Sequence, residues 1–456
     1  MSSEIAAASK AVVMGPSFWI ATAIFILAYG LIISEKIHKT IVGIFGAAVM
    51  IVLGIVTQED AFNSLDLGID WNVIFLLVSM MIIINIMKPT GVFEYIAIKS
   101  AKIAKGKPFM IMAIFSVVTA IVSAFLDNVT TVLLIAPVTL LICQALELDV
   151  VPFLITEAIA SNIGGTATLI GDPPNIMIAS KAQLDFMAFI YHLTPVIIVV
   201  LIAYIITIKL IFGKRLQVRE ELKQRIMAMN EREAIKDPVL LKKSLVVLAI
   251  TITGFILHGF LHMEPATIAL FGAGLLLLVS GNKEPHHILA EAEWTTLFFF
   301  MGLFIIIGGV VKVGLIKWMS VQVLNITQGN MFATSMIVMW FSAFASAFID
   351  NIPYVATMNP LIIDMAKQIW PNLSGTELLH HPDLMPIWWS LALGACLGGN
   401  GTAIGASANV IVVGMAEKMG KPISFKKFML YGMPLMIESV IICTLYVWLR
   451  YYVIKI

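Results

Sequence analysis

The sequence has little charge and little cysteine for its length. Only 12% of its 456 residues are charged, whereas 60% are hydrophobic, and the mean hydropathy is +0.97. A soluble protein of this composition would lack the polar side chains that cover a water-exposed surface. Apolar runs long enough to cross the ~30 Å hydrocarbon core of a bilayer recur along the chain. These features predict an all-α polytopic membrane protein, with membrane lipid as a partner and no nucleic acid.

Cysteine is almost absent, which excludes two classes of structure. Cys143, Cys396 and Cys443 each lie inside an apolar run. Three scattered thiols form neither a disulfide framework nor a metal-binding pattern. We therefore expect them to be packing residues, and we expect no cofactor. No basic region precedes Phe18, so the first apolar run is predicted to be a retained span and not a cleaved signal.

One stretch of the chain occurs twice. SAFLDNVTTVLLIAP (123–137) aligns without gaps on SAFIDNIPYVATMNP (346–360), and GGTATLIGDPPN (164–175) aligns on GGNGTAIGASAN (398–409). In both copies an apolar run is interrupted first by Asp-Asn and then by a Gly-rich cluster. Matched interruptions in one order indicate two structural repeats.

Each repeat is expected to contain three full spans, a re-entrant hairpin, a broken span and a last full span. The first repeat is 1–212, with spans at 17–34, 40–57, 71–88 and 190–212, a hairpin at 109–145 and a broken helix at 152–180. A cytoplasmic charged linker follows at 213–243. The second repeat is 244–456, with spans at 244–262, 266–281, 294–312 and 428–450, a hairpin at 331–370 and a broken helix at 386–417. Five crossings per repeat would invert one relative to the other, as in transporters with inverted repeats.

The distribution of Lys and Arg supports this topology. With an extracytoplasmic N-terminus, 22 of the 29 basic residues fall in inside loops and 7 fall outside. Basic loops are retained on the cytoplasmic side. Both termini are therefore predicted to be extracytoplasmic.

Two segments are more polar than the rest. Residues 92–107 place Phe93, Ile96, Ala97 and Ile103 opposite lysines, which is typical of an amphipathic helix in the membrane interface. The linker contains KRLQVREELKQR, and we interpret its charges as a solvated helical face of a plain connector.

The interruptions are the candidate binding site. Non-helical backbone at membrane depth is tolerated only where protein or a water-filled cavity satisfies it. Asp127 or Asn128 can cap the returning helix of the first hairpin, and Asp172 precedes Pro173-Pro174 as a cap would. Helix capping alone does not explain ionisable side chains at this depth, which are costly and point to function.

The acids favour Na⁺ coordination or proton carriage, with Na⁺ or H⁺ as the coupling ion. The candidate Na⁺ ligands are Asp127, Asn128, Asp350 and Asn351. Glu157 has no acidic counterpart in the second repeat, so it is open whether it relays protons or only forms structural hydrogen bonds. No Lys or Arg occurs in the four broken segments, so an anionic substrate would depend on helix ends, hydroxyls, amides and co-bound cations.

These motifs resemble the ion transporter superfamily, which includes citrate and dicarboxylate transporters, arsenical-pump membrane proteins, NhaD-type antiporters and the melanosomal P protein. SAFLDNVTT, EAIASNIGGTATLIGDPPN and the paired SAFIDN are most similar to the P-protein-like branch. The resemblance implies an inverted-repeat scaffold whose hairpin tips and broken helices form the site, with alternating access by movement of that unit. The positions that match the family's motifs, and that the resemblance implies as binding residues, are Asp127, Asn128, Thr130, Asn162, Gly164, Gly165, Thr166, Gly171, Asp172, Asn175, Asp350, Asn351, Gly399, Asn400, Thr402 and Asn409. Thr131, Glu157, Thr168 and Ser407 complete the set of candidate substrate- and ion-binding residues. The second broken span reads GASAN where the first reads GDPPN, so the resemblance does not imply two symmetric cation sites.

The leading functional hypothesis is an ion-coupled secondary transporter of a small anion, which would be a carboxylate, an inorganic anion or arsenite. A Na⁺/H⁺ antiporter is the alternative. An ion channel remains open as a different class, and an intramembrane protease is disfavoured because Asp172 lacks the earlier Gly of a GxGD motif and His258 and His262 lack the Glu of HExxH. The chain has no Walker motif, so any ATPase would be a separate subunit. We expect a homodimer in the inner membrane of a bacterial or archaeal cell, and no enzymatic activity.

Overall fold

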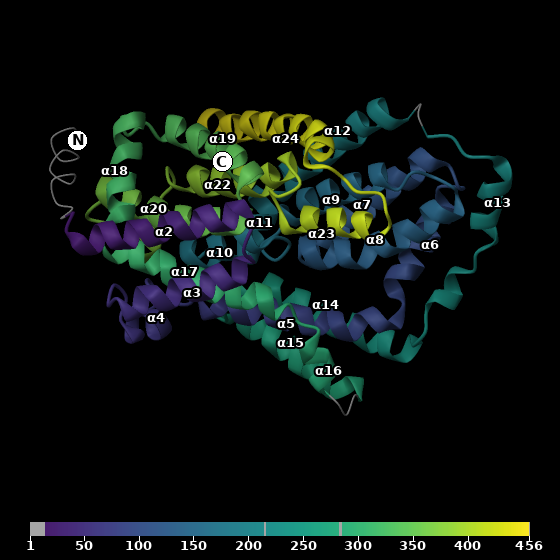
Figure 1. Cartoon of the computed structure of the whole chain (residues 1–456), viewed down its shortest axis with the longest axis horizontal. Coiled ribbons are helices and arrows are strands. Elements are labelled where there is room, and N and C mark those ends of the chain that lie inside the picture. Colours follow the sequence, from purple (N-terminus) through teal and green to yellow (C-terminus); the bar gives the residue numbers. More distant parts are fainter. Residues whose placement is uncertain (1–13, 214–215, 282–284, 456) are drawn as a thin grey trace.

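The structure is a computed structural model that describes residues 14–213, 216–281 and 285–455 (Figure 1). These residues form helices joined by turns and irregular segments, without a strand among them. Nine of their helices are long and apolar enough to cross a membrane. The predicted all-α polytopic membrane class is confirmed.

The helices of the first half run in the predicted order. They are α2 (Pro16–Ser34), α3 (Lys39–Val52), α4 (Gln58–Asn63), α5 (Trp71–Met87), η1 (Lys88–Thr90), α6 (Val92–Ile103), α7 (Pro108–Phe125), α8 (Asn128–Ala145), α9 (Val151–Gly165), α10 (Pro173–Ala182), α11 (Phe186–His192) and α12 (Thr194–Phe212). Helices α7 and α8 cover the residues for which a hairpin is predicted, and the gap between α9 and α10 lies in the range for which a broken helix is predicted.

The second half follows the linker elements α13 (Glu220–Ala228) and η2 (Glu231–Ala234). Its helices are α14 (Pro238–Leu261), α15 (Pro265–Ser280), α16 (Pro285–Ala290), α17 (Trp294–Lys312), α18 (Leu315–Thr327), α19 (Met331–Phe348), α20 (Asn351–Ile369), α21 (Gly375–Leu379), α22 (Met385–Gly398), η3 (Gly399–Gly401), α23 (Ser407–Lys418), α24 (Phe425–Val447) and the π-helical η4 (Trp448–Ile454). Helices α19 and α20 are the second hairpin, and α22 and α23 flank the second break.

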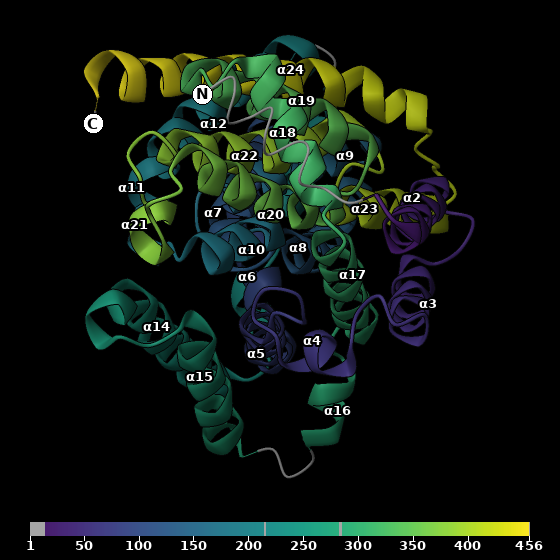
Figure 2. The same ribbon diagram turned by 90° about the vertical axis from the view of Figure 1, so that its left-hand side faces the viewer.

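The two halves repeat one arrangement. Helices α5, α6, α7 and α8 each begin 223 residues before α17, α18, α19 and α20, as 71 and 294 or 128 and 351 show. Helices α9 and α10 begin 234 residues before α22 and α23 (151 and 385, 173 and 407). Each half packs one of its helices against the other half. Helix α3 of the first half packs against α17 of the second, and α15 of the second half packs against α5 of the first. Figure 2 shows α5, α14 and α15 below the hairpins and broken helices.

The hairpin helices have similar lengths: α7, α8 and α19 have 18 residues each, and α20 has 19. At 1.5 Å per residue each arm is ~27 Å long, close to the thickness of the hydrocarbon core. Helix length therefore does not separate a re-entrant hairpin from two spans. The number of crossings and the inverted orientation of the halves stay predictions.

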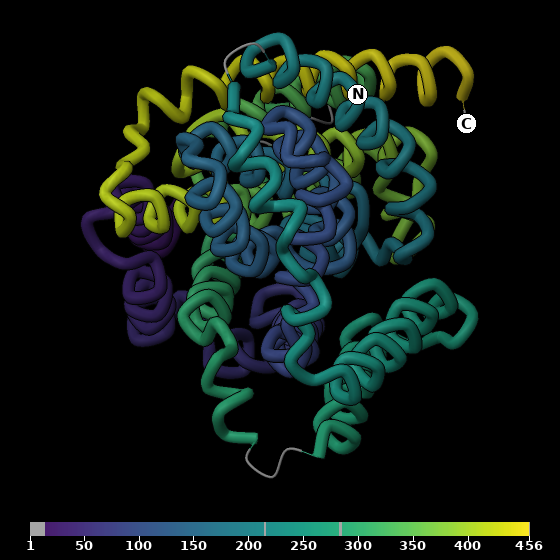
Figure 3. Tube along the Cα trace, turned by 90° about the vertical axis from the view of Figure 1, so that its right-hand side faces the viewer, coloured from purple at the N-terminus to yellow at the C-terminus, as the bar shows by residue number. Residues whose placement is uncertain are grey.

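The linker is docked on the protein. Figure 3 shows it crossing in front of the first-half helices. Helix α13 packs against α6 and α8, and it buries Leu222 and Ile226 while exposing Glu220, Glu221 and Arg225. The Lys102 ammonium lies 2.6 Å from the carboxylate of Glu231 and, by this hydrogen bond, lowers the pKa of that carboxyl. The solvated face predicted for the linker is therefore one side of a helix whose other side is packed.

Two local predictions differ from the structure. Helix α14 begins at Pro238, six residues before the predicted 244, because Asp237 caps it through Leu240 N at 2.8 Å. Helix α6 buries Phe93 and Ala97 against protein, whereas Ile103, placed on the same face by the sequence pattern, is 63% exposed.

Candidate functional site

The starts of four helices meet at one small cavity of about 20 Å³. The hairpin tips contribute Asp127, Asn128 and Asn351, and the breaks contribute Asp172 and Ser407. These residues flank the N-termini of α8, α20, α10 and α23. Such a volume is about that of one water molecule or one small ion. The structure therefore gathers residues from all four interruptions around one ion-sized space.

The opposite wall of the cavity comes from α5 and α17. Leu77 and Met81 of α5 and Phe300 of α17 supply apolar surface. Glu293, directly before α17, and Thr296, in its first turn, supply polar groups. The sequence analysis did not single out Glu293 or Thr296. The sequence feature that could have identified Glu293 is its position as an acidic residue immediately before an apolar span.

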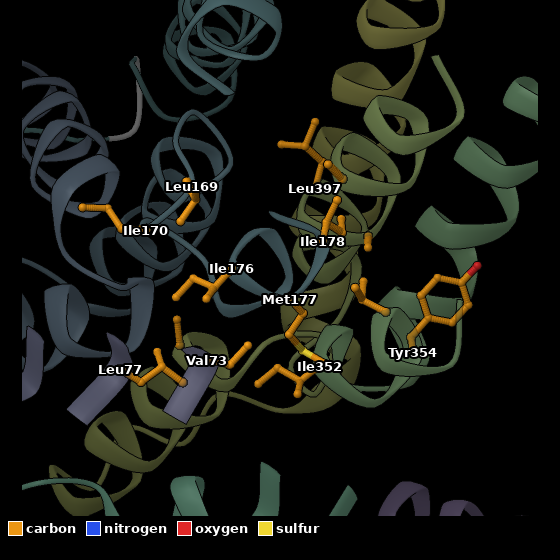
Figure 4. Packing of buried hydrophobic residues seen from close by; sticks show 14 of the residues in the cluster. Val73, Leu77, Leu169, Ile170, Ile176, Met177, Ile178, Ile352, Tyr354 and Leu397 are labelled. Atoms are coloured by element: carbon orange, nitrogen blue, oxygen red, sulfur yellow. The ribbon is translucent and has the colours of Figure 1, made fainter. Parts of the chain in front are cut away.

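Apolar packing holds the broken span of the first half in place. Ile176, Met177 and Ile178 of α10 are buried. Figure 4 shows Ile176 facing Val73 and Leu77 of α5, while Met177 lies beside Ile352 of α20. Helix α10 thus packs between the wall helix α5 and the second hairpin, which fixes the position of Asp172 at its start.

Asp127 caps helix α8 with both carboxylate oxygens. The Thr130 backbone N–H donates to Oδ1 at 2.9 Å, and the Thr130 hydroxyl donates to Oδ2 at 2.5 Å. A side-chain acceptor at this position satisfies a free N–H of the first turn. The predicted capping role of Asp127 is confirmed, and Asp127 also lines the cavity.

Asp172 is not the predicted helix cap. Its side chain forms no capping hydrogen bond to α10. Instead, the Asn351 amide donates to it, at 3.4 Å to Oδ1 and 3.3 Å to Oδ2. Because Asn351 starts α20 and Asp172 precedes α10, this contact joins the first broken span to the second hairpin. Both side chains are buried.

Asp350 is paired with a lysine that the sequence analysis missed. The Lys39 ammonium donates to Asp350 Oδ2 at 2.6 Å and to the Ser407 hydroxyl at 3.0 Å, and Ser407 Oγ donates to Asp350 Oδ2 at 3.1 Å. Lys39 begins α3, outside the four broken segments. The four broken segments themselves contain no Lys or Arg, but packing brings this basic side chain from a distant helix to the starts of α20 and α23.

A chain of asparagines connects the halves. The Asn128 amide donates to Asn162 Oδ1 at 3.0 Å, and the Asn162 amide donates to Asn400 Oδ1 at 2.9 Å and Asn409 Oδ1 at 3.1 Å. All four side chains are buried. Asn162, Asn400 and Asn409, three predicted site residues from the broken spans, are thus joined by hydrogen bonds next to Asn128 at the tip of the first hairpin.

Equivalent residues close the two breaks. The Asn175 amide donates to Thr168 O at 2.8 Å, and the Asn409 amide donates to Thr402 O at 2.8 Å. The hydroxyls of Thr168 and Thr402 donate to the carbonyls at the ends of α7 and α19, those of Ala124 and Ala347. These four residues satisfy freed backbone groups, so they shape the site without lining the cavity.

The remaining candidates lie in the surrounding shell. Thr166 donates from Oγ1 to Asn162 O at 2.7 Å, while the Thr131 hydroxyl is buried with no hydrogen-bond partner among the described residues. The glycines permit close backbone contact. A Cβ on Gly171 would lie 2.6 Å from Gly165 O, and one on Gly399 would lie 3.0 Å from Gly405 O.

Glu157 is separate from the cavity. It lies on α9, where the Thr139 hydroxyl of α8 donates to its Oε1. Its Oε2 is buried without a partner among the described residues. The structure places Glu157 between α8 and α9, and the choice between proton relay and structural hydrogen bonding remains as the sequence left it.

The four candidate Na⁺ ligands do not surround one point. Asp127, Asn128 and Asn351 line the cavity, whereas Asp350 is outside its lining and is engaged by Lys39. Within the described ranges, no three His, Cys, Asp or Glu side chains are grouped as a metal site. Any cation in the cavity would therefore use amide, hydroxyl and carbonyl oxygens beside one or two carboxylates.

Comparison with known proteins is consistent with this arrangement. A family model described as citrate transporter matches residues 29–394. An uncharacterized transporter of Mycobacterium bovis is 47% identical over 435 residues, covering 95% of this chain and 99% of that protein. A 46 kDa membrane protein of Mycobacterium leprae is 45% identical, covering 96% and 99%. The P protein of Mus musculus is 34% identical over 505 residues, covering 93% of this chain and 59% of that protein. The chain therefore belongs to the citrate transporter family and is a membrane transporter.

Proposed function

We propose that this protein is a secondary active transporter that couples the movement of a small anion to a Na⁺ or H⁺ gradient by alternating access. A carboxylate is the first candidate for the anion, because the matching family is described as citrate transporters. The observation that carries the proposal is the convergence of all four interruptions on one ion-sized cavity.

One side of the site suits a cation. Asp127, Asp172 and Glu293 line the cavity together with the amides Asn128 and Asn351. Carboxylate and amide oxygens are suitable ligands for a hard cation. Ionisable side chains inside a membrane protein commonly mark an ion path or a proton relay.

The other side suits an anion. Helix N-termini carry partial positive charge and attract anions. Acids precede α8, α10 and α20, but Ala406 precedes α23, and the first residue of α23 is Ser407 beside the Lys39 ammonium. The departure from GDPPN to GASAN therefore leaves α23 without an acid of its own before its first residue, and its Ser407 contacts the Lys39 ammonium as well as the Asp350 carboxylate.

The cavity is too small for a carboxylate such as citrate. Its volume of about 20 Å³ is that of roughly one water molecule. Substrate entry therefore requires the walls from α5 and α17 to separate from the hairpin tips. This is the kind of movement that alternating access requires.

A Na⁺/H⁺ antiporter is the second candidate. It is favoured by three carboxylates lining one small cavity, because two of them can exchange protons for Na⁺ without an anion. For either function we propose inverted repeats with both termini extracytoplasmic, in a bacterial or archaeal inner membrane, as a homodimer.

Flux in proteoliposomes separates the candidates. Radiolabelled citrate and dicarboxylates are offered with an inward Na⁺ gradient, an inward H⁺ gradient, or neither, and internal pH is followed with a dye. Accumulation above the external concentration that depends on one gradient supports the anion transporter. Na⁺-driven alkalinisation without any added anion supports the antiporter. Currents that persist without a coupling gradient would indicate a channel and contradict both.

A further inference from the structure

We propose that Lys39 is an internal competitor of the coupling cation, and that its ammonium occupies the place at Asp350 that Na⁺ takes when the transporter is loaded. This inference rests on the proposed function with Na⁺ as the coupling ion, and it assigns a specificity-determining role to a residue outside the four interruptions.

The geometry is that of a closed ionic triangle. Lys39 Nζ lies 2.6 Å from Asp350 Oδ2 and 3.0 Å from Ser407 Oγ, and Ser407 Oγ lies 3.1 Å from the same carboxylate oxygen. The ammonium also lies 5.2 Å from the centre of the Phe299 ring. A cation binding to Asp350 Oδ2 would therefore meet a positive charge at hydrogen-bond distance.

The pair joins two groups of helices. Lys39 begins α3, which packs against α2 and α17, whereas Asp350 and Ser407 lie at the starts of α20 and α23. The side chain of Asp350 is 11% exposed, and that of Lys39 is 27% exposed. Lys39 can therefore move its charge to solvent when displaced, while the carboxylate stays in place to receive another cation.

The repeat shows that packing does not require this lysine. Helix α15 takes the place of α3 in the other half, where it packs against α5, and it contains neither Lys nor Arg. Asp127, the counterpart of Asp350, forms no ion pair among the described residues and is held by Thr130. Helices α15 and α5 thus form the equivalent of the α3–α17 contact without an ion pair. This indicates that Lys39 is present for its interaction with Asp350 and not for the packing of α3.

Mutual exclusion follows from electrostatics. Two like charges at hydrogen-bond distance from one oxygen repel each other strongly where little solvent screens them. Lys39 and a Na⁺ ion therefore do not share one carboxylate oxygen.

The test is a cation titration of the purified full-length protein in detergent. Thermal stability is measured against NaCl at constant ionic strength, because ligands of the native state raise stability by mass action. The variants are Lys39→Met, Lys39→Arg and the double variant Lys39→Met with Asp350→Asn. Lys39→Arg keeps the charge, and it controls for loss of the side chain.

Lys39→Met is expected to lower the half-saturating Na⁺ concentration about tenfold, because no ammonium has to be displaced. Lys39→Arg is expected to match the wild type or to need more Na⁺, since guanidinium binds carboxylates with two hydrogen bonds. The double variant is expected to lose the gain seen in Lys39→Met.

An unchanged cation response in Lys39→Met, with a responsive wild type, would overturn this inference and leave the proposed function standing. A rise in the KM for a transported carboxylate, with the cation response unchanged, would also overturn it and make Lys39 a substrate ligand. A wild type that does not respond to Na⁺ would also overturn this inference. If Lys39→Met does not fold, an unchanged or raised Na⁺ requirement in folded Lys39→Arg, together with loss of the Na⁺ response in Asp350→Asn, supports competition. A Na⁺ response that Asp350→Asn retains would overturn it.

Discussion

The side-chain amide of Asn162 donates to Asn400 Oδ1 at 2.9 Å, and this contact joins the broken helix of the first half to that of the second. The same amide also reaches Asn409, and Asn162 Oδ1 accepts from Asn128. Asn162 is therefore the central member of the buried polar network behind the cavity.

Asn162→Ala should lower the free energy of unfolding by about 2 kcal/mol, because it leaves buried amide groups of Asn128, Asn400 and Asn409 without their partner. It should also abolish transport, since the broken helices lose their connection. Thermal denaturation and proteoliposome uptake measure the two effects. Asn63→Ala is the control, because Asn63 bonds only Glu59 in an exposed helix. Wild-type stability of Asn162→Ala would show that the network contributes nothing.

Asp127→Asn should abolish transport and leave the folded protein in the membrane. The amide oxygen of Asn still accepts the Thr130 N–H and caps α8, but the cavity loses one of its carboxylates. Uptake and the yield of monodisperse protein are measured together. Asp237→Asn is the matched control, since Asp237 caps α14 at an exposed position away from the cavity. Normal uptake by Asp127→Asn would remove this residue from the transport site.

Gly164→Ala and Gly398→Ala should each destabilise the protein by about 2 kcal/mol or more, because an added Cβ overlaps the neighbouring backbone. The Cβ would lie 2.0 Å from Ala120 O in the first case and 2.5 Å from Ala343 O in the second. Each hairpin would have to move away from its broken helix. Gly274→Ala is the control, with no atom within 4 Å of its Cβ. Thermal denaturation that ranks all three variants alike would contradict the close-packing argument.

Ile226→Asp should release the linker from α6 and α8. Ile226 is fully buried, and an ionised carboxylate at that position would lose its hydration without a partner. Trypsin should then cut faster after Lys223 and Arg225 in the intact membrane protein. Met227→Asp changes the adjacent residue, which is 46% exposed, and should leave the cleavage rate unchanged. Equal cleavage of the two variants would show that the linker is not held by this contact.

The fold was predictable where the signals are local. The first hairpin was predicted at 109–145 and spans Pro108–Ala145, because Pro108 starts one arm and Asp127 caps the other. The start of α14 was misplaced because Lys242 and Lys243 read as linker charges, although Asp237 and Pro238 already formed a helix-start signal.

The site was predictable only in part. The interruptions identify which segments meet, since each break is recognised from polar and Gly residues that are adjacent in the sequence. The identity of their partners is not local: Lys39 and Asp350 are 311 residues apart in sequence, and Asp172 binds Asn351 from the other half. Repeat symmetry was also a poor guide to the partners of the acids, because Asp127 pairs with Thr130 whereas Asp350 pairs with Lys39.

The exchange of α3 against α17 and α15 against α5 makes each half complete the other's scaffold. A chain severed between α12 and α14 would hold together as two fragments only when both were synthesised in the same cell. A lone first fragment would have to recruit a second copy of itself to cover α3 and α5. A forerunner with a single repeat could thus have worked only as a pair of identical chains.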